Sequence, residues 1–192
     1  MITYEIRDAL YINLTNRCAN NCSFCIRNHP ENMGFDLWLQ KEPSLEEILG
    51  DIKNPENYSE IVFCGYGEPF ERLREVIEIC KYLKKRGARI RINTNGQANL
   101  IWKRNIVPEL KGLVDSISIS LNAKSAEDYV KLCRPENGEE AYNAILEFAK
   151  ECVKYIPEVC LTVVDVISAH EIELCRSIAC SVGARFRVRH FC

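Results

Sequence analysis

Three cysteines stand within eight residues near the start of the chain. Cys18, Cys22 and Cys25 lie in the segment CANNCSFC, and the next cysteine is Cys64. Thiolates are preferred ligands of soft metals and iron–sulfur clusters. A structural zinc site typically adds a second CxxC pair, which is missing here. Three thiolates can instead hold a [4Fe–4S] cube at three corners, so the spacing predicts a cluster with one iron open to substrate or cofactor.

Two other interpretations of these cysteines stay open. The same thiols could form a zinc knuckle in a zinc-stabilised binding module. His29 lies where two-cluster ferredoxins place a fourth cysteine before a proline, so it could close the cluster and make a non-catalytic iron–sulfur electron carrier; a plain loop residue is the simpler explanation. For Cys64, packing in the core is likewise a simpler explanation than a role in chemistry. For Cys192, a position at a frayed chain end is the simpler explanation.

Length and composition indicate a globular protein. The 192 residues suit a single domain over 1–192, with 47% apolar residues, 27% charged residues and a net charge of −2. No apolar run approaches the roughly 20 residues of a membrane span, and the first residues resemble neither a signal peptide nor a transit peptide. We therefore expect a cytoplasmic protein that binds neither membranes nor nucleic acid.

Cysteine usage argues against a disulfide scaffold. The chain has 11 cysteines, an odd number. Four of them, Cys80, Cys152, Cys175 and Cys180, fall within helical patterns, where a small apolar thiol packs well. We expect these four to be core residues and only the tight group to bind metal.

The elements that must position the cysteines alternate between strand and helix. Short apolar or alternating runs predict strands, and they cover residues 11–14, 61–64, 89–93, 116–120, 159–164 and 185–190. Helical spacing separates them, with capping boxes expected at Ser44 and Ser168 and glycine stops at Gly87 and Gly183. Six such units predict a parallel α/β sheet curved into a partial (β/α)6 TIM-like barrel, since eight units would need about 250 residues.

The chemically suggestive segments all follow strands. CANNCSFC follows the first strand, GYGEP the second and TNG the third, while SLN closes the fourth and His190 ends the sixth. Ligand sites of such sheets lie beyond the carboxyl ends of the strands. The fold and the motifs therefore predict one site at one edge.

These motifs resemble the radical S-adenosylmethionine (SAM) superfamily. Its cluster loop is CxxxCxΦC with an aromatic residue before the last cysteine, here Phe24. The segment CGYGEP resembles its GGEP motif through Gly65, Gly67 and Glu68, although Tyr66 replaces the first glycine of the strict form. Two further segments, TNG and SLN, also resemble parts of the family's cofactor site. Their candidate cofactor-binding residues are Asn95 in TNG, and Ser120 and Asn122 in SLN. The segment around Val164 resembles the one that packs on adenine.

The resemblance implies a cofactor pair and a reaction. A [4Fe–4S] cluster on Cys18, Cys22 and Cys25 would bind SAM through its open iron and, once reduced, cleave it to methionine and a 5′-deoxyadenosyl radical. That radical would abstract hydrogen from a substrate that the sequence does not identify, and a flavodoxin or ferredoxin would supply the electron. Length and motif order most resemble the compact members found with TatD-type nucleases.

Arginines alternate with apolar residues on two predicted strands. Arg89 and Arg91 oppose isoleucines on the third, and Arg185, Arg187 and Arg189 oppose Phe and Val on the sixth. If the apolar sets face the helices, the arginines line the concave side and suit an anionic group of a small-molecule substrate. Alternatively, the last strand is an edge blunted by charge, with its arginines in water.

Overall fold

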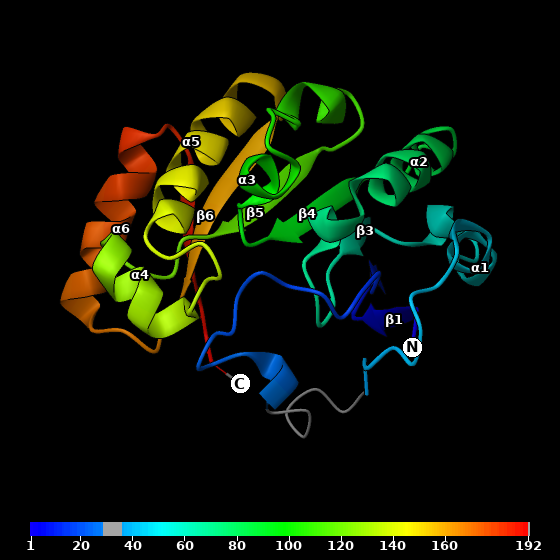
Figure 1. The fold of residues 1–192 in the computed structure, drawn as a ribbon. Coiled ribbons are helices and arrows are strands. Elements are labelled where there is room, and N and C mark those ends of the chain that lie inside the picture. Colours follow the sequence, from blue (N-terminus) through cyan, green and yellow to red (C-terminus); the bar gives the residue numbers. More distant parts are fainter. Residues whose placement is uncertain (29–35, 192) are drawn as a thin grey trace.

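The computed structural model describes residues 1–28 and 36–191, which form a curved sheet of seven strands (Figure 1). The strands are β1 (Thr3–Ile6), β2 (Ala9–Ile12), β3 (Glu60–Phe63), β4 (Ile90–Thr94), β5 (Ser116–Ser120), β6 (Glu158–Val164) and β7 (Arg185–Arg189). Their order in the sheet is their order in the chain. The strands β2 to β7 pair in parallel, and within the described residues β7 does not pair with β1. The predicted open α/β barrel is confirmed.

Six α-helices connect the strands. They are α1 (Leu45–Asp51), α2 (Leu73–Lys84), α3 (Ala98–Trp102), α4 (Ala126–Cys133), α5 (Glu140–Tyr155) and α6 (Ala169–Ser181) among the described residues. Both predicted capping boxes form, at the starts of α1 and α6, where each serine and the glutamate three residues later exchange hydrogen bonds. Gly87 and Gly183 follow α2 and α6 with φ of 72° and 78°, the left-handed conformation that ends a helix.

The amino-terminal hairpin was not predicted. β1 and β2 pair antiparallel through a two-residue turn at Arg7 and Asp8, with Arg7 at φ 55°. Tight hairpin turns usually carry glycine or asparagine at such positions, and this turn has neither. The first parallel strand is therefore shifted from the predicted 11–14 to 9–12.

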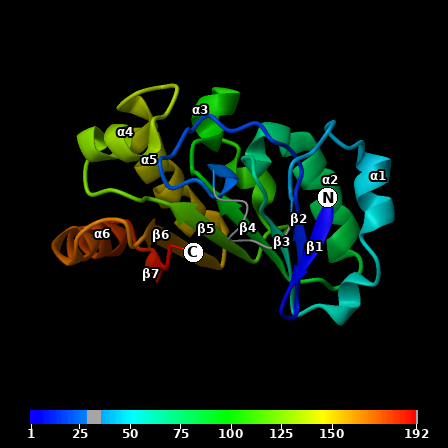
Figure 2. The same ribbon diagram turned by 90° about the horizontal axis from the view of Figure 1, so that it is seen from below.

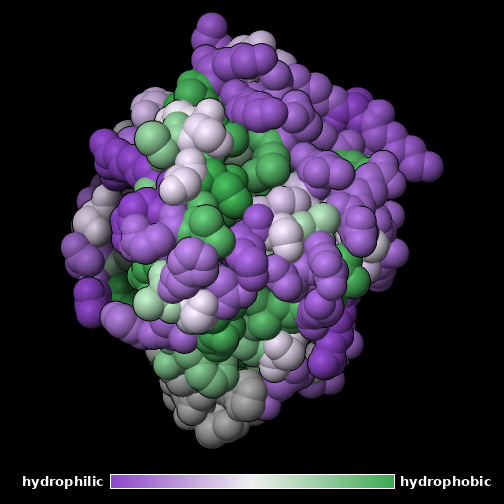
Figure 3. Space-filling view, turned by 90° about the vertical axis from the view of Figure 1, so that its left-hand side faces the viewer, coloured by the Kyte–Doolittle hydropathy of each residue, from purple (hydrophilic) through white to green (hydrophobic). Residues whose placement is uncertain are grey.

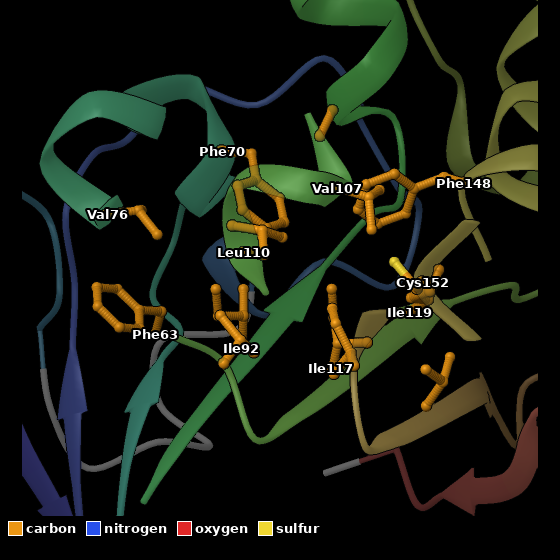
Figure 4. Packing of buried hydrophobic residues seen from close by; sticks show 14 of the residues in the cluster. Phe63, Phe70, Val76, Ile92, Val107, Leu110, Ile117, Ile119, Phe148 and Cys152 are labelled. Carbon is orange, nitrogen blue, oxygen red and sulfur yellow. The ribbon is translucent and has the colours of Figure 1, made fainter. Parts of the chain in front are cut away.

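The outer face of the sheet carries the hydrophobic core. Alternate residues of the central strands, such as Phe63, Ile92 and Ile117, point toward the helices, where Phe70 and Phe148 meet edge to face with ring centroids 6.0 Å apart (Figure 4). Burial of such side chains contributes about 1.5–3 kcal/mol each. Three of the four cysteines expected in the core, Cys80, Cys152 and Cys175, are buried. The fourth prediction is wrong, because Cys180 lies on the exposed side of α6.

The inner face of the sheet is polar. Strand alternation turns the serines of β5 and the arginines of β4 and β7 away from the core. Figure 2 shows the sheet from below, turned by 90° from the first view. The polar side chains predicted for the site therefore lie on the inner face and in the loops at the carboxyl edge.

No helix in the described part of the chain is both long and apolar enough to cross a membrane. Figure 3 looks from the α6 side and shows a mainly hydrophilic surface with apolar residues in a broken band. The exposed apolar side chains include Val166 and Leu174, at 40% and 38% of their full exposure.

Candidate functional site

The loops that follow β2, β3, β4 and β5 meet at the carboxyl edge of the sheet. Asn13, directly after β2, ties them together, because its side chain donates to the Leu37 carbonyl oxygen at 2.6 Å and accepts from the Tyr66 amide at 3.3 Å. Buried amides of this kind fix a loop, since each unsatisfied group would cost about 1–3 kcal/mol. The long loop after β2 therefore has a fixed start.

The cysteine loop is held by the end of α4 and the residues after it. The amides of Asn21 and Ser23 donate to the carbonyl oxygens of Cys133 and Leu132, both at 3.0 Å. Asn20 and Pro135 form an isolated antiparallel bridge. These contacts join the loop to residues 132–136 at the end of α4, and they fix the backbone that carries the cysteines.

A buried polar cluster lies beneath this loop. The Tyr129 hydroxyl accepts from the Asn20 side chain at 2.8 Å, and the Gln97 side chain donates to Asn20 Oδ1 at 2.7 Å. Next to them, Asn95 Nδ2 lies 3.8 Å from the Cys18 sulfur. One predicted cofactor-binding residue therefore contacts one predicted metal ligand.

The three thiols share one loop but do not all converge. Burial raises the pKa of Cys18 to about 12. The Cys22 thiol hydrogen-bonds with Cys133, which, with burial, raises the pKa of Cys22. The Cys25 amide donates to the Cys22 carbonyl oxygen at 3.1 Å, which closes a turn between those two cysteines. Among the described residues no group of three or more Cys, His, Asp or Glu side chains is arranged to hold a metal ion.

The donor set nevertheless suits an iron–sulfur cluster. Three thiols lie on one eight-residue loop at the carboxyl edge, and thiolates are the usual ligands of such clusters. Backbone hydrogen bonds of Asn21, Ser23 and Cys25 fix the loop around the cysteines. His29 and Cys192, considered above, lie outside the described residues.

Two glycines let the loop after β3 pack against the loop after β2. A Cβ on Gly65 would lie 2.0 Å from Asn13 Oδ1, and a Cβ on Gly67 would lie 2.3 Å from the Thr15 carbonyl oxygen. These distances are impossible for any side chain. The two glycines of GYGEP are thus required by packing within the protein, against the Asn13 side chain at Gly65 and against the backbone of Thr15 at Gly67.

Glu68 is the most enclosed charged group of the site. Its side chain is 3% exposed and accepts from Thr94 Oγ1 at 2.7 Å, the Asn95 amide at 2.6 Å and the Phe70 amide at 3.1 Å. Burial raises its pKa from 4.5 to about 7, although these hydrogen bonds oppose the rise. The carboxyl group therefore joins the loops after β3 and β4.

The remaining predicted site residues surround the same edge. Asn122 adopts the left-handed conformation at φ 58°, and its buried Oδ1 has no hydrogen-bond partner among the described residues. Ser120, at the end of β5, accepts from Arg189 at 3.5 Å. The Tyr66 ring packs beside Tyr4, with its buried hydroxyl unpartnered within the described part, and Phe24 packs partly buried against the main core.

Sequence reasoning missed four residues that shape this site. Asn20 and Gln97 lie within or beside recognised motifs, so their position was a signal that went unused. Tyr129 and Cys133 lie on α4, far along the chain, and their spacing indicates only a helix face. Of the other thiols considered, Cys64 is half-buried at the end of β3, where its carbonyl oxygen accepts from the Tyr4 hydroxyl at 3.1 Å.

Comparison with known proteins gives one consistent family. The model of the Radical SAM superfamily matches residues 12–175. Two relatives are a Methanocaldococcus jannaschii protein provisionally named a glycyl-radical enzyme activating enzyme, 30% identical over 71% of this chain, and a Pyrococcus furiosus tungsten-containing aldehyde ferredoxin oxidoreductase cofactor-modifying protein, 31% identical over 78%. The chain spans 53% and 39% of these relatives, about half their length or less.

Solved structures share the fold. Streptococcus suis SuiB bound to S-adenosylmethionine matches 95% of this chain and 38% of its own, with a TM-score of 0.66 and 17% identity. Methylornithine synthase (PylB) matches 96% of this chain and 53% of its own, with a TM-score of 0.63 and 16% identity. At these identities the likeness concerns architecture alone.

Proposed function

The chain belongs to the radical SAM superfamily, and on that premise we propose that it is an enzyme that cleaves S-adenosylmethionine reductively at a [4Fe–4S] cluster. The observation that carries the proposal is the cysteine loop, which presents three thiols within eight residues at the carboxyl edge of an open barrel, with Cys133 reaching it from α4. Three protein ligands leave one iron for the cofactor. An electron carrier or a zinc module would have no use for that opening.

Cys18, Cys22 and Cys25 would hold the cluster. A bound and reduced cluster would pass one electron to SAM. Cleavage of the SAM sulfonium would then give methionine and a 5′-deoxyadenosyl radical that abstracts hydrogen from the substrate. The Cys18 thiol is half-buried, and its contact with Asn95 would help to orient it. The backbone hydrogen bonds between residues 19–23 and 132–136 would hold the loop in place.

The cofactor would lie between the loops after β3, β4 and β5. Gly65, Tyr66 and Gly67 would approach its methionyl part through their backbone, because the two glycines let this loop pack directly on the start of the cysteine loop. The unpartnered Oδ1 of Asn122 is a ready acceptor for a cofactor hydroxyl or amino group. Glu68 would act mainly by positioning, because its carboxyl oxygens already accept three hydrogen bonds from neighbouring loops.

Three further parts of the proposal rest on the family and the sequence. A flavodoxin- or ferredoxin-type protein would supply the electron, the substrate would be a small molecule, and the enzyme would work in the cytoplasm. The substrates named for the relatives differ from one another, and the chain spans only part of each relative. The placement with the TatD-associated proteins stays a prediction.

Anaerobic reconstitution tests the proposal. The wild-type protein is expected to bind about four irons and sulfides, and to form 5′-deoxyadenosine and methionine from SAM with dithionite as reductant. Alanine at Cys18, Cys22 or Cys25 should remove both cluster and cleavage, whereas Cys80→Ala, a buried core cysteine, is the matched control that should keep both. A colourless zinc protein, or a cluster inert to SAM, would refute the enzyme.

A further inference from the structure

The inner face of β5, β6 and β7 presents hydroxyls and guanidinium groups side by side. Ser118 pairs in register with Cys160 and Ser120 with Thr162, and Thr162 pairs with Arg187 on β7. Residues paired in register point to the same face of a sheet. The opposite residues of β7, Phe186 and Val188, pack toward the core, so Arg187 faces inward.

Arg187 is exposed on the edge strand, but its side chain lies across the inner face of the sheet. Its Nη2 donates to Ser118 Oγ at 3.2 Å, which means that the side chain passes over β6 to reach β5. Arg189 makes the equivalent contact one step higher, with Ser120 Oγ at 3.5 Å. Ser118 beneath Arg187 is 7% exposed. The exposure of Arg185 and Arg187 agrees with an edge strand blunted by charge, and the contacts with the serines of β5 are a further feature of this face.

Arg187 differs from Arg89, Arg91 and Arg185 in its charge balance. Arg91 pairs with Glu60 at 2.8 Å, while Arg89 and Arg185 pair with Glu158 at 2.9 and 3.7 Å. Arg187 has no carboxylate within ion-pair distance among the residues that the structure describes, only the neutral serine. Its exposed guanidinium is therefore a positive charge that a ligand can reach, held by Ser118 over the inner face of the sheet.

We propose that Arg187 and the hydroxyl of Ser118 bind an anionic group, a carboxylate or a phosphate, of the substrate. A guanidinium presents a planar fork of N–H donors that matches both groups, and a serine hydroxyl adds a further donor. The anion would sit on the inner face of β5 to β7, and the rest of the molecule would extend toward the strand ends where the cysteine loop lies. That this anion belongs to a substrate rests on the proposed function, whereas the binding of an anion at Arg187 does not.

Anion titration of the reconstituted protein, first without SAM and then with excess SAM, tests the site. Inorganic phosphate and succinate are the two probes, added at constant ionic strength while thermal unfolding is followed by circular dichroism. The wild-type Tm should rise saturably with one or both probes. A response to phosphate alone assigns a phosphate group, and a response to succinate alone assigns a carboxylate.

Matched variants decide whether Arg187 is responsible. Arg187→Gln should weaken the probe by about tenfold or more, because a charged hydrogen bond of about 1.5–3 kcal/mol is lost. Arg185→Gln is the control, on the same strand and face but 75% exposed and paired with Glu158, and it should keep the response. Should Arg187→Gln not fold, Arg187→Lys replaces it, with several-fold weaker binding expected because an ammonium lacks the fork.

Three outcomes would overturn the anion site. They are a wild-type Tm indifferent to both probes, a response unchanged in the Arg187 variants, and a response abolished by excess SAM, which would assign the arginine to the cofactor's own carboxylate. Cleavage of SAM by the wild type without probe tests the proposed function separately. If cleavage fails while the Arg187-dependent response persists, the anion site stands and the proposed reaction does not.

Discussion

Replacement of Glu68 by glutamine should change how the stability of the cluster-free protein depends on pH. Glu68 is the buried carboxyl group that links the loops after β3 and β4, with hydrogen bonds from Thr94, Asn95 and Phe70. Its pKa is raised from 4.5 to about 7 by burial. Glutamine has nearly the same shape but carries no charge and has one acceptor oxygen fewer.

The sign of the effect follows from the raised pKa. Between pH 4.5 and about 7 the folded protein keeps a proton on Glu68 that the unfolded chain has lost, so the free energy of unfolding falls as pH rises through this window. At about 1.4 kcal/mol per pH unit, the loss amounts to about 3 kcal/mol. Glu68→Gln should abolish this part of the pH dependence. Near pH 5 the variant should be less stable by about 1–2 kcal/mol, because its NH2 group opposes one backbone N–H donor.

Urea unfolding at several pH values between about 5 and 8 measures the effect. Trp102 reports on the site, because its indole nitrogen donates to the Phe70 carbonyl oxygen at 2.7 Å. The quantity of interest is the difference between wild type and variant at each pH, which cancels the titration of other groups. Glu147→Gln is the control, since that carboxylate is 70% exposed and pairs with Lys150. A wild-type-minus-variant difference that stays constant with pH would refute the buried, proton-binding role of Glu68.

Three further predictions concern the loops. Gly67→Ala should destabilise the protein by about 1–3 kcal/mol in urea unfolding, because its Cβ would meet the Thr15 carbonyl oxygen at 2.3 Å. Gly50→Ala, with open space around it inside α1, should stabilise the protein by about 0.5–1 kcal/mol. Equal effects of the two substitutions would contradict the close-approach argument. Tyr129→Phe should cost about 1–2 kcal/mol in the same assay through the lost hydrogen bond from Asn20, and no loss relative to Tyr82→Phe, at a half-buried position on α2, would count against the buried cluster. Cys133→Ala should keep full iron content after reconstitution, measured by colorimetric iron assay, and a protein without iron would make Cys133 a ligand rather than a neighbour of Cys22.

Much of the fold follows from local sequence signals. The serine caps of α1 and α6, the glycine stops after α2 and α6, and the alternation on β4 and β5 each act over a few residues, so they can be read without knowing the partner elements. The missed hairpin shows the limit. Its turn at Arg7 has no glycine or asparagine, and pairing with the rest of the sheet overrides the local preference.

The site was predictable to the extent that its residues lie directly after strands. Parallel strands bring such residues to one edge, which is why Asn95 and Cys18, 77 positions apart, come into contact. The partners on α4 were not predictable, because a helix face records burial but not which loop it covers. The prediction that Cys180 is buried was wrong for a related reason, because helical spacing does not show how far a helix face turns from the core.

The arrangement of the thiols bears on how a cluster would assemble. Partial burial raises the pKa of Cys18 to about 12, and Cys133 together with burial raises the pKa of Cys22, so the environment of both thiols favours the protonated form. Cluster binding requires thiolates and therefore releases protons from these groups, which makes assembly dependent on pH. The backbone of the loop is already paired with residues 132–136 and tied through Asn20 to the polar cluster beneath it. The cluster would therefore assemble on a loop whose backbone is already held at the edge of the barrel.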